Sequence, residues 1–102
     1  MKSRFNMSIK LIFEANLKRI FRTEIEFFEE NKSIDEIVSH LFNLCKSEPR
    51  FSLLKSFVND IDDFFSKVLI LINERDINAL DGRSTIINDG DTIIFLPITH
   101  GG

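Results

Sequence analysis

Two apolar runs near the C-terminal end of the sequence constrain the fold more than any other feature. "VLILI" (68–72) and "TIIFLPI" (92–98) have the length of strands and are rich in Leu and β-branched residues. Successive side chains of a strand point to opposite faces, and in both runs both faces are apolar. A dense apolar run of this length fits best as a central strand, and we expect 68–72 to be one.

The N-terminal part of the sequence has the pattern of a hairpin. Apolar residues occupy alternate positions of 7–13, which predicts a half-buried strand. The alternation returns in 20–27, and "EANLK" (14–18) between the two runs is typical of a short connection. We therefore predict two strands joined by a short loop.

A helix is predicted to begin at Ser33. In "SIDE" (33–36) the Ser33 hydroxyl can accept a hydrogen bond from the Glu36 amide while the Glu36 carboxylate reaches back to Ser33, which is a capping box. Pro49 stops the helix. The apolar positions that recur at helical spacing are Ile34, Ile37, Val38, Leu41, Leu44 and Cys45.

A second amphipathic helix is predicted within 50–67. Its apolar residues recur at steps of three and four over 51–65: Phe51, Leu54, Val58, Ile61 and Phe65. After the strand that follows, "ERD" (74–76) is turn chemistry, and Asp89 and Asp91 flank Gly90 as a further turn before the last strand. This order of elements predicts a small α+β domain, and it leaves the pairing of the strands open.

The pairing comes from a resemblance to a known family. "VLILIN" (68–73), "NDGDTIIFLP" (88–97) and "THGG" (99–102) resemble the ubiquitin-like sulfur carriers. These include the ubiquitin-related modifier of eukaryotes, the small archaeal modifier proteins and the small subunit of molybdopterin synthase. The resemblance implies a ubiquitin-like β-grasp over 1–98, with a mixed sheet packed on one main helix, the first and last strands side by side at its centre, and a flexible tail over 99–102. The extra helix at about 51–65 is a departure from the family, whose typical members have a shorter loop there.

The resemblance also implies a function for the tail. A partner adenylating enzyme of the E1 type would use ATP to activate the α-carboxylate of Gly102. Sulfur would then convert it to a thiocarboxylate for tRNA thiolation, or a lysine of a target protein would capture it. Gly101 and His100 would thread the tail into the partner, because glycine has no Cβ to obstruct a narrow channel. The alternatives are a sulfur-carrying subunit of molybdopterin synthase and a ubiquitin-like interaction domain that is never activated.

The last strand offers a docking row. Ile93 and Phe95 point to one side, while Ile94, Leu96 and Ile98 point to the other. The resemblance places Ile93 and Phe95 in the core. The resemblance assigns Leu96 and its neighbours to partner docking. In the competing interpretation, the helix over 51–65 buries this row.

Composition argues against several other classes of protein. A chain of 102 residues fits one domain, and its net charge of −3 makes a direct nucleic-acid ligand unexpected. We find no membrane span, signal peptide, metal spacing, P-loop or nucleophile–base pair, so we expect a cytoplasmic protein that is not an enzyme and has no cofactor of its own. Cys45 is predicted as a small core residue and His40 as a solvated one.

Overall fold

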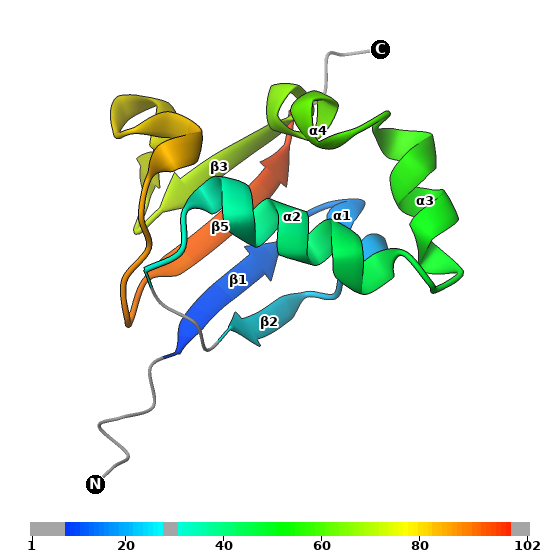
Figure 1. The fold of residues 1–102 in the computed structure, drawn as a ribbon, viewed down its shortest axis with the longest axis horizontal. Coiled ribbons are helices and arrows are strands. Elements are labelled where there is room, and N and C mark those ends of the chain that lie inside the picture. Colours follow the sequence, from blue (N-terminus) through cyan, green and yellow to red (C-terminus); the bar gives the residue numbers. More distant parts are fainter. Residues whose placement is uncertain (1–7, 28–30, 99–102) are drawn as a thin grey trace, which may run out of the picture.

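The computed structural model describes residues 8–27 and 31–98, and this part of the chain contains a mixed five-stranded sheet (Figure 1). The strand order is β2-β1-β5-β3-β4. Strands β1 and β5 are parallel, and the other neighbours are antiparallel. The strands are β1 (Ile9–Phe13), β2 (Glu24–Phe27), β3 (Val68–Ile72), β4 (Arg75–Asp76) and β5 (Thr92–Pro97).

The two apolar runs lie in the interior of this sheet, as predicted. β5 pairs with β1 on one side and with β3 on the other, and β3 in turn pairs with the two-residue strand β4. The register places Ile94 beside Ile12 of β1 and Leu71 of β3. Both strands therefore form hydrogen bonds along both edges.

Helix α2 (Ile34–Cys45) begins at the predicted capping box. The Ser33 hydroxyl accepts from the Glu36 amide at 3.1 Å, and the Glu36 carboxylate accepts from the Ser33 amide at 2.9 Å. The helix crosses one face of the sheet and buries its apolar stripe there (Figure 1). Leu44 is 43% exposed, contrary to its predicted place in the stripe, because Phe42 and Cys45 fill the core at that turn.

The prediction of one helix over 51–65 is wrong, because two helices occupy the segment. α3 (Arg50–Phe57) and α4 (Ile61–Lys67) are separated by an extended Val58. The Asp60 carboxylate caps α4 by accepting from the Asp63 amide, and the Asp63 carboxylate accepts from the Asn59 amide, both at 2.8 Å. This reciprocal capping satisfies donors at a new helix start, so the break is favoured over a continuous helix.

The predicted strand over 20–27 is also too long. A single helical turn, α1 (Leu17–Ile20), begins within the predicted connection and takes in the first residue of the predicted strand, and β2 starts only at Glu24. Ile20 and Phe21 are both buried, and the Phe21 ring stacks on Phe13 with 4.9 Å between centroids. Adjacent residues of a strand cannot face the same core, whereas a helical turn and its end can present both to it.

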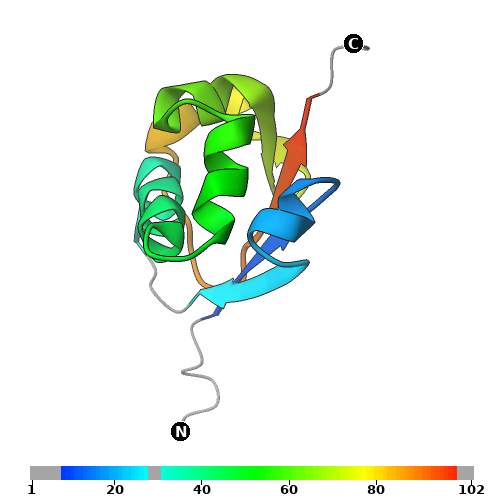
Figure 2. The ribbon, with the colours of Figure 1, turned by 90° about the vertical axis from the view of Figure 1, so that its right-hand side faces the viewer.

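Helices α2, α3 and α4 lie on the same side of the sheet, as Figure 2 shows edge-on. Phe64 of α4 packs against Phe95 of β5 with 6.2 Å between ring centroids, and both are fully buried. Two short helices, η2 (Ile77–Ala79) and η3 (Gly82–Ser84), connect β4 to the last turn. None of the helices in the described residues is both long enough and apolar enough to cross a membrane.

A single arginine ties α4 to α2. Arg83, in η3, places its guanidinium 2.7 Å from a carboxylate oxygen of Asp35 and 2.7 Å from one of Asp62. The same group lies over the ring of Phe65 at 4.1 Å. These contacts, led by the hydrogen bond to Asp62, raise the pKa of Arg83 above its ordinary value.

Candidate functional site

The last strand presents a distinct row of residues to each face of the sheet. Ile93 and Phe95 are fully buried under the helices, as predicted. Leu96 is 39% exposed and Ile98 is 42% exposed, while Ile94 is half-buried. The alternation of the strand thus directs one row into the core and the predicted docking row away from it.

Neighbouring strands extend this docking row into a patch. The register sets Ile12 of β1 and Leu71 of β3 on either side of Ile94, and it sets Leu69 of β3 beside Leu96. Paired residues of adjacent strands point to the same face, so their side chains form one surface. We call this surface the outer face and define it as Ile12, Leu69, Leu71, Ile94, Leu96 and Ile98.

No helix of the described residues covers the outer face. Helices α3 and α4, which form the 51–65 segment, pack with α2 on the opposite side (Figures 1 and 2). The interpretation in which this segment buries the row is therefore wrong. The outer face is left as an apolar patch on a sheet, which is the kind of surface that proteins use for partners.

Charged side chains border the outer face on the β2 side. Lys10 is paired in register with Glu26, and Ile12 is paired with Glu24, so these charges lie on the same face as Ile12. All three charged residues are exposed. An apolar centre with a polar rim is the usual anatomy of a protein interface.

The end of β5 is held where α4 meets β3. The amide of Ile98 donates to the Lys67 carbonyl at 2.8 Å. The Lys67 ammonium lies 3.1 Å from the Asp63 carboxylate and donates to the Phe57 carbonyl at 3.2 Å. These contacts fix the root of the tail, by which we mean Ile98 and its anchor Lys67. His100, Gly101 and Gly102 lie outside the described residues.

The carboxylate pair before β5 is turn chemistry, as predicted. The Asp91 carboxylate accepts from the Asn88 amide at 2.7 Å and from the Asn73 side chain at 2.9 Å. Gly90 has a φ of 87°, a left-handed conformation that glycine adopts without a Cβ clash. These contacts fix where β5 begins, and Asp89 is exposed beside them.

The two remaining candidate residues, Cys45 and His40, make contacts typical of residues that support the fold. Cys45 is fully buried, and burial raises the pKa of its thiol, as expected for a core residue. His40 is exposed, and its ring packs edge-to-face with that of Phe27, with 5.2 Å between centroids. Over residues 8–27 and 31–98, His, Cys, Asp and Glu side chains form no group of three that could hold a metal ion.

Reasoning from the sequence missed part of this site. It singled out β5 but not Ile12, whose place beside Ile94 depends on pairing between opposite ends of the chain. The apolar character of both faces of "VLILI" was a usable signal for Leu69 and Leu71. Lys67 carried no signal, because its role depends on where the chain places its main-chain carbonyl and ammonium group.

The sequence matches known proteins over most of its length. The profile of the ThiS family matches residues 11–102. A curated relative, the ubiquitin-related modifier 1 homolog of Dictyostelium discoideum, is 31% identical over 102 residues, which span 94% of this chain and 100% of the relative.

Solved structures share the fold. The ubiquitin-related modifier of Trypanosoma brucei has a TM-score of 0.68 and 23% identity, covering 94% of this chain and 96% of that one. A chain in the crystal structure of the Amycolatopsis orientalis BexX/CysO complex has a TM-score of 0.60 and 18% identity, covering 92% of this chain and 99% of that one. These similarities identify the sheet and its helices as a ubiquitin-like β-grasp.

Proposed function

The chain belongs to the ThiS family of ubiquitin-like carriers and modifiers, and from this premise we propose that Gly102 is the residue that is activated and consumed. In this proposal the α-carboxylate of Gly102 is adenylated by a partner enzyme and converted to a thiocarboxylate in the cytoplasm. The sulfur then serves tRNA thiolation, or the activated acyl group is joined to lysines of target proteins. The exposed outer face beside the root of the tail is the observation that carries the proposal.

The chemistry requires a partner because a carboxylate is a poor electrophile. Attack of the Gly102 carboxylate on the α-phosphorus of ATP forms an acyl-adenylate and releases pyrophosphate. Sulfur from a persulfide then attacks the acyl carbon and AMP leaves; reductive cleavage of the sulfur–sulfur bond by a thiol leaves the thiocarboxylate. ATP is a substrate of the partner enzyme, so the carrier contributes a reacting end and a docking surface.

The position of the outer face suits this role. Leu96 near the end of β5 and Ile98 just after it are both exposed, immediately before residues 99–102. A partner that binds the outer face would receive the segment that follows Ile98. The hydrogen bond from the Ile98 amide to Lys67 supports the proposal, because it sets the point from which the tail starts.

His100 and Gly101 are proposed to thread the tail through an enclosed path in the partner. A Cβ on Gly101 would leave less room between the tail and the walls of this path. It would also exclude backbone conformations that only glycine adopts freely. We expect His100 to position the tail only, because a carboxylate that is already ionised at neutral pH needs no proton removed from it.

ATP–pyrophosphate exchange with the adenylating enzyme of the same organism tests the proposal. Deletion of Gly102 should abolish exchange, Gly101→Ala should reduce it strongly, and His100→Ala should reduce it modestly and without a new pH dependence between pH 6 and 8. Normal exchange by the chain lacking Gly102 would contradict the proposal. Normal exchange by Gly101→Ala would contradict only the threading argument.

A further inference from the structure

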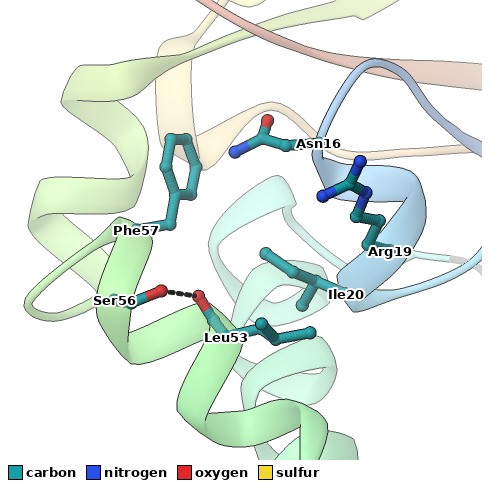
Figure 3. Close-up of a pocket in the computed structure, with 6 residues that line it drawn as sticks. All are labelled: Asn16, Arg19, Ile20, Leu53, Ser56 and Phe57. Atoms are coloured by element: carbon teal, nitrogen blue, oxygen red, sulfur yellow. Dashed lines mark hydrogen bonds between the residues drawn. The ribbon is translucent and has the colours of Figure 1, made fainter.

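A cleft between α1 and α3 remains unexplained by the activation chemistry. It encloses about 260 Å³ and is lined by Asn16, Arg19, Ile20, Leu53, Ser56 and Phe57 (Figure 3). This volume is below the roughly 300 to 1,000 Å³ that small-molecule sites usually have. The size suits a single large side chain of another protein.

Three of the six residues that line the cleft are apolar. Ile20 contributes from α1, and Leu53 and Phe57 contribute from α3 (Figure 3). Leu53 is 47% exposed, although it lies one residue before the fully buried Leu54. An exposed leucine that borders a hollow beside a half-buried phenylalanine offers apolar area that a partner side chain can cover.

A free cation also lines the cleft. Within the described part of the chain, the Arg19 side chain has no hydrogen bond, ion pair or ring contact, whereas the Lys18 ammonium lies 3.7 Å from the Glu14 carboxylate. A guanidinium binds carboxylates with paired hydrogen bonds. The cleft is therefore complementary to an apolar side chain that has an Asp or Glu close to it.

The cleft is connected to the root of the tail through Lys67. The Lys67 ammonium donates to the carbonyl of Phe57, a lining residue, while the Lys67 carbonyl accepts from Ile98. Figure 2 shows α1 and α3 on the side facing the viewer, with the end of β5 above α1. A protein that holds the tail is thus within reach of the cleft.

We propose that the α1–α3 cleft is a second contact for the adenylating enzyme, which inserts an apolar side chain flanked by a carboxylate. The inference rests on the proposed function, because it assigns the cleft to the enzyme that activates Gly102. It adds a surface on the helical side of the molecule to the outer face of the sheet. The cleft then contributes to the choice of partner and has no part in the chemistry.

Pyrophosphate exchange measured over a range of carrier concentrations tests this inference, with the adenylating enzyme of the same organism as the probe. Arg19→Gln should raise KM about five- to tenfold and leave kcat unchanged, since it removes binding and no reacting group. Leu53→Ala should do the same. Lys18→Gln is the matched control for Arg19→Gln, because it removes the same charge from the same helix. Leu44→Ala is the matched control for Leu53→Ala, because it removes a similarly exposed leucine from α2. Both controls should keep the parent KM within about twofold.

The result for the parent chain distinguishes failure of the cleft inference from failure of the proposed function. If the parent supports exchange and the two cleft variants keep its KM, the cleft inference is overturned and the proposed function stands. Equal losses in the cleft variants and their controls would also overturn it. No exchange by the parent chain would overturn both. Thermal melts of all five proteins show whether a raised KM reflects lost binding, and a cleft variant that is unfolded at the assay temperature counts against an exposed cleft.

Discussion

Replacing Leu96 with Arg should separate docking from folding, because the outer face lies outside the core. Leu96 is 39% exposed, whereas its neighbour Phe95 is fully buried on the opposite face. We expect Leu96→Arg to remain folded and to lose affinity for the adenylating enzyme. Replacing Phe95 should instead reduce the stability of the fold.

The expected loss of stability follows from how much of Leu96 is covered. Full burial of a leucine contributes about 1.5 to 3 kcal/mol, so the covered part of Leu96 corresponds to about 1 to 2 kcal/mol. The aliphatic stem of arginine keeps some of this contact. We therefore expect a loss of about 1 kcal/mol, which lowers the Tm of a domain of this size by about 4 to 8 °C. Phe95→Ala should cost about 3 to 5 kcal/mol.

The expected loss of affinity is larger than the loss of stability. An arginine at the centre of a desolvated apolar contact carries a charge that the partner does not match. The free energy of binding should fall by about 2 to 4 kcal/mol, which raises Kd roughly 30- to 1,000-fold. Ile86→Arg is the matched control, because Ile86 is 48% exposed and is not part of the outer face.

Urea unfolding followed by circular dichroism gives the stability, and calorimetric titration with the adenylating enzyme gives the Kd. A folded Leu96→Arg protein with the parent Kd would refute docking through the outer face. Loss of the helical signal in Leu96→Arg would refute the assignment of Leu96 to an uncovered surface. An equal loss of affinity in Ile86→Arg would show that added charge, and not its position, weakens binding.

Three further predictions concern the scaffold. Ser33→Ala removes the hydroxyl of the capping box and should lower the free energy of unfolding by about 1 kcal/mol in a urea titration; an unchanged midpoint would contradict this role. The pKa of Asp63 is lowered from its ordinary value of 3.8, first by the hydrogen bond from the Asn59 amide and then by Lys67, so the stability it contributes is present above that pH and is lost as the pH falls below it. Asp63→Asn should therefore flatten the fall of Tm in acid, and a parallel fall would argue against the capping contact. Burial raises the pKa of the Cys45 thiol, so Ellman's reagent should label it at pH 8 only as fast as the chain unfolds, and immediate labelling of the folded protein would show that the thiol is accessible.

The elements that the sequence predicted well are those with strong local signals. The capping box set the start of α2 because both of its hydrogen bonds join residues three apart. Alternation identified β1, and dense apolar runs identified β3 and β5. Alternation along β5 also put Ile93 and Phe95 on one face and Leu96 on the other, and the resemblance identified the first pair as the core.

The elements that the sequence did not reveal depend on competing local signals or on contacts between distant segments. Helical spacing continues from Leu54 through Ile61, and it masked the capping aspartate at Asp60 that starts a new helix. The helical spacing of Leu17 and Ile20 spans only one turn, which is too short to outweigh an alternating pattern. The bond between Arg83 and Asp35 joins residues 48 positions apart, so no local pattern predicts it.

The candidate site was predictable in its chemistry and only partly in its geometry. The row of Ile94, Leu96 and Ile98 followed from strand alternation alone. Whether that row was covered depended on which side of the sheet α3 and α4 pack, and an amphipathic pattern does not specify a side. Pairing of β1 with β5 then decided that Ile12 joins the row.

Intact-mass spectrometry after incubation with the adenylating enzyme, ATP and a persulfide sulfur donor with a reducing thiol tests the central claim most directly. We predict a mass gain equal to the replacement of one oxygen by sulfur. Fragmentation should place the gain on Gly102, and it should be absent without ATP and in the chain that lacks Gly102. An unchanged mass under conditions in which the enzyme is active on ATP, or a gain located on Cys45, would contradict it.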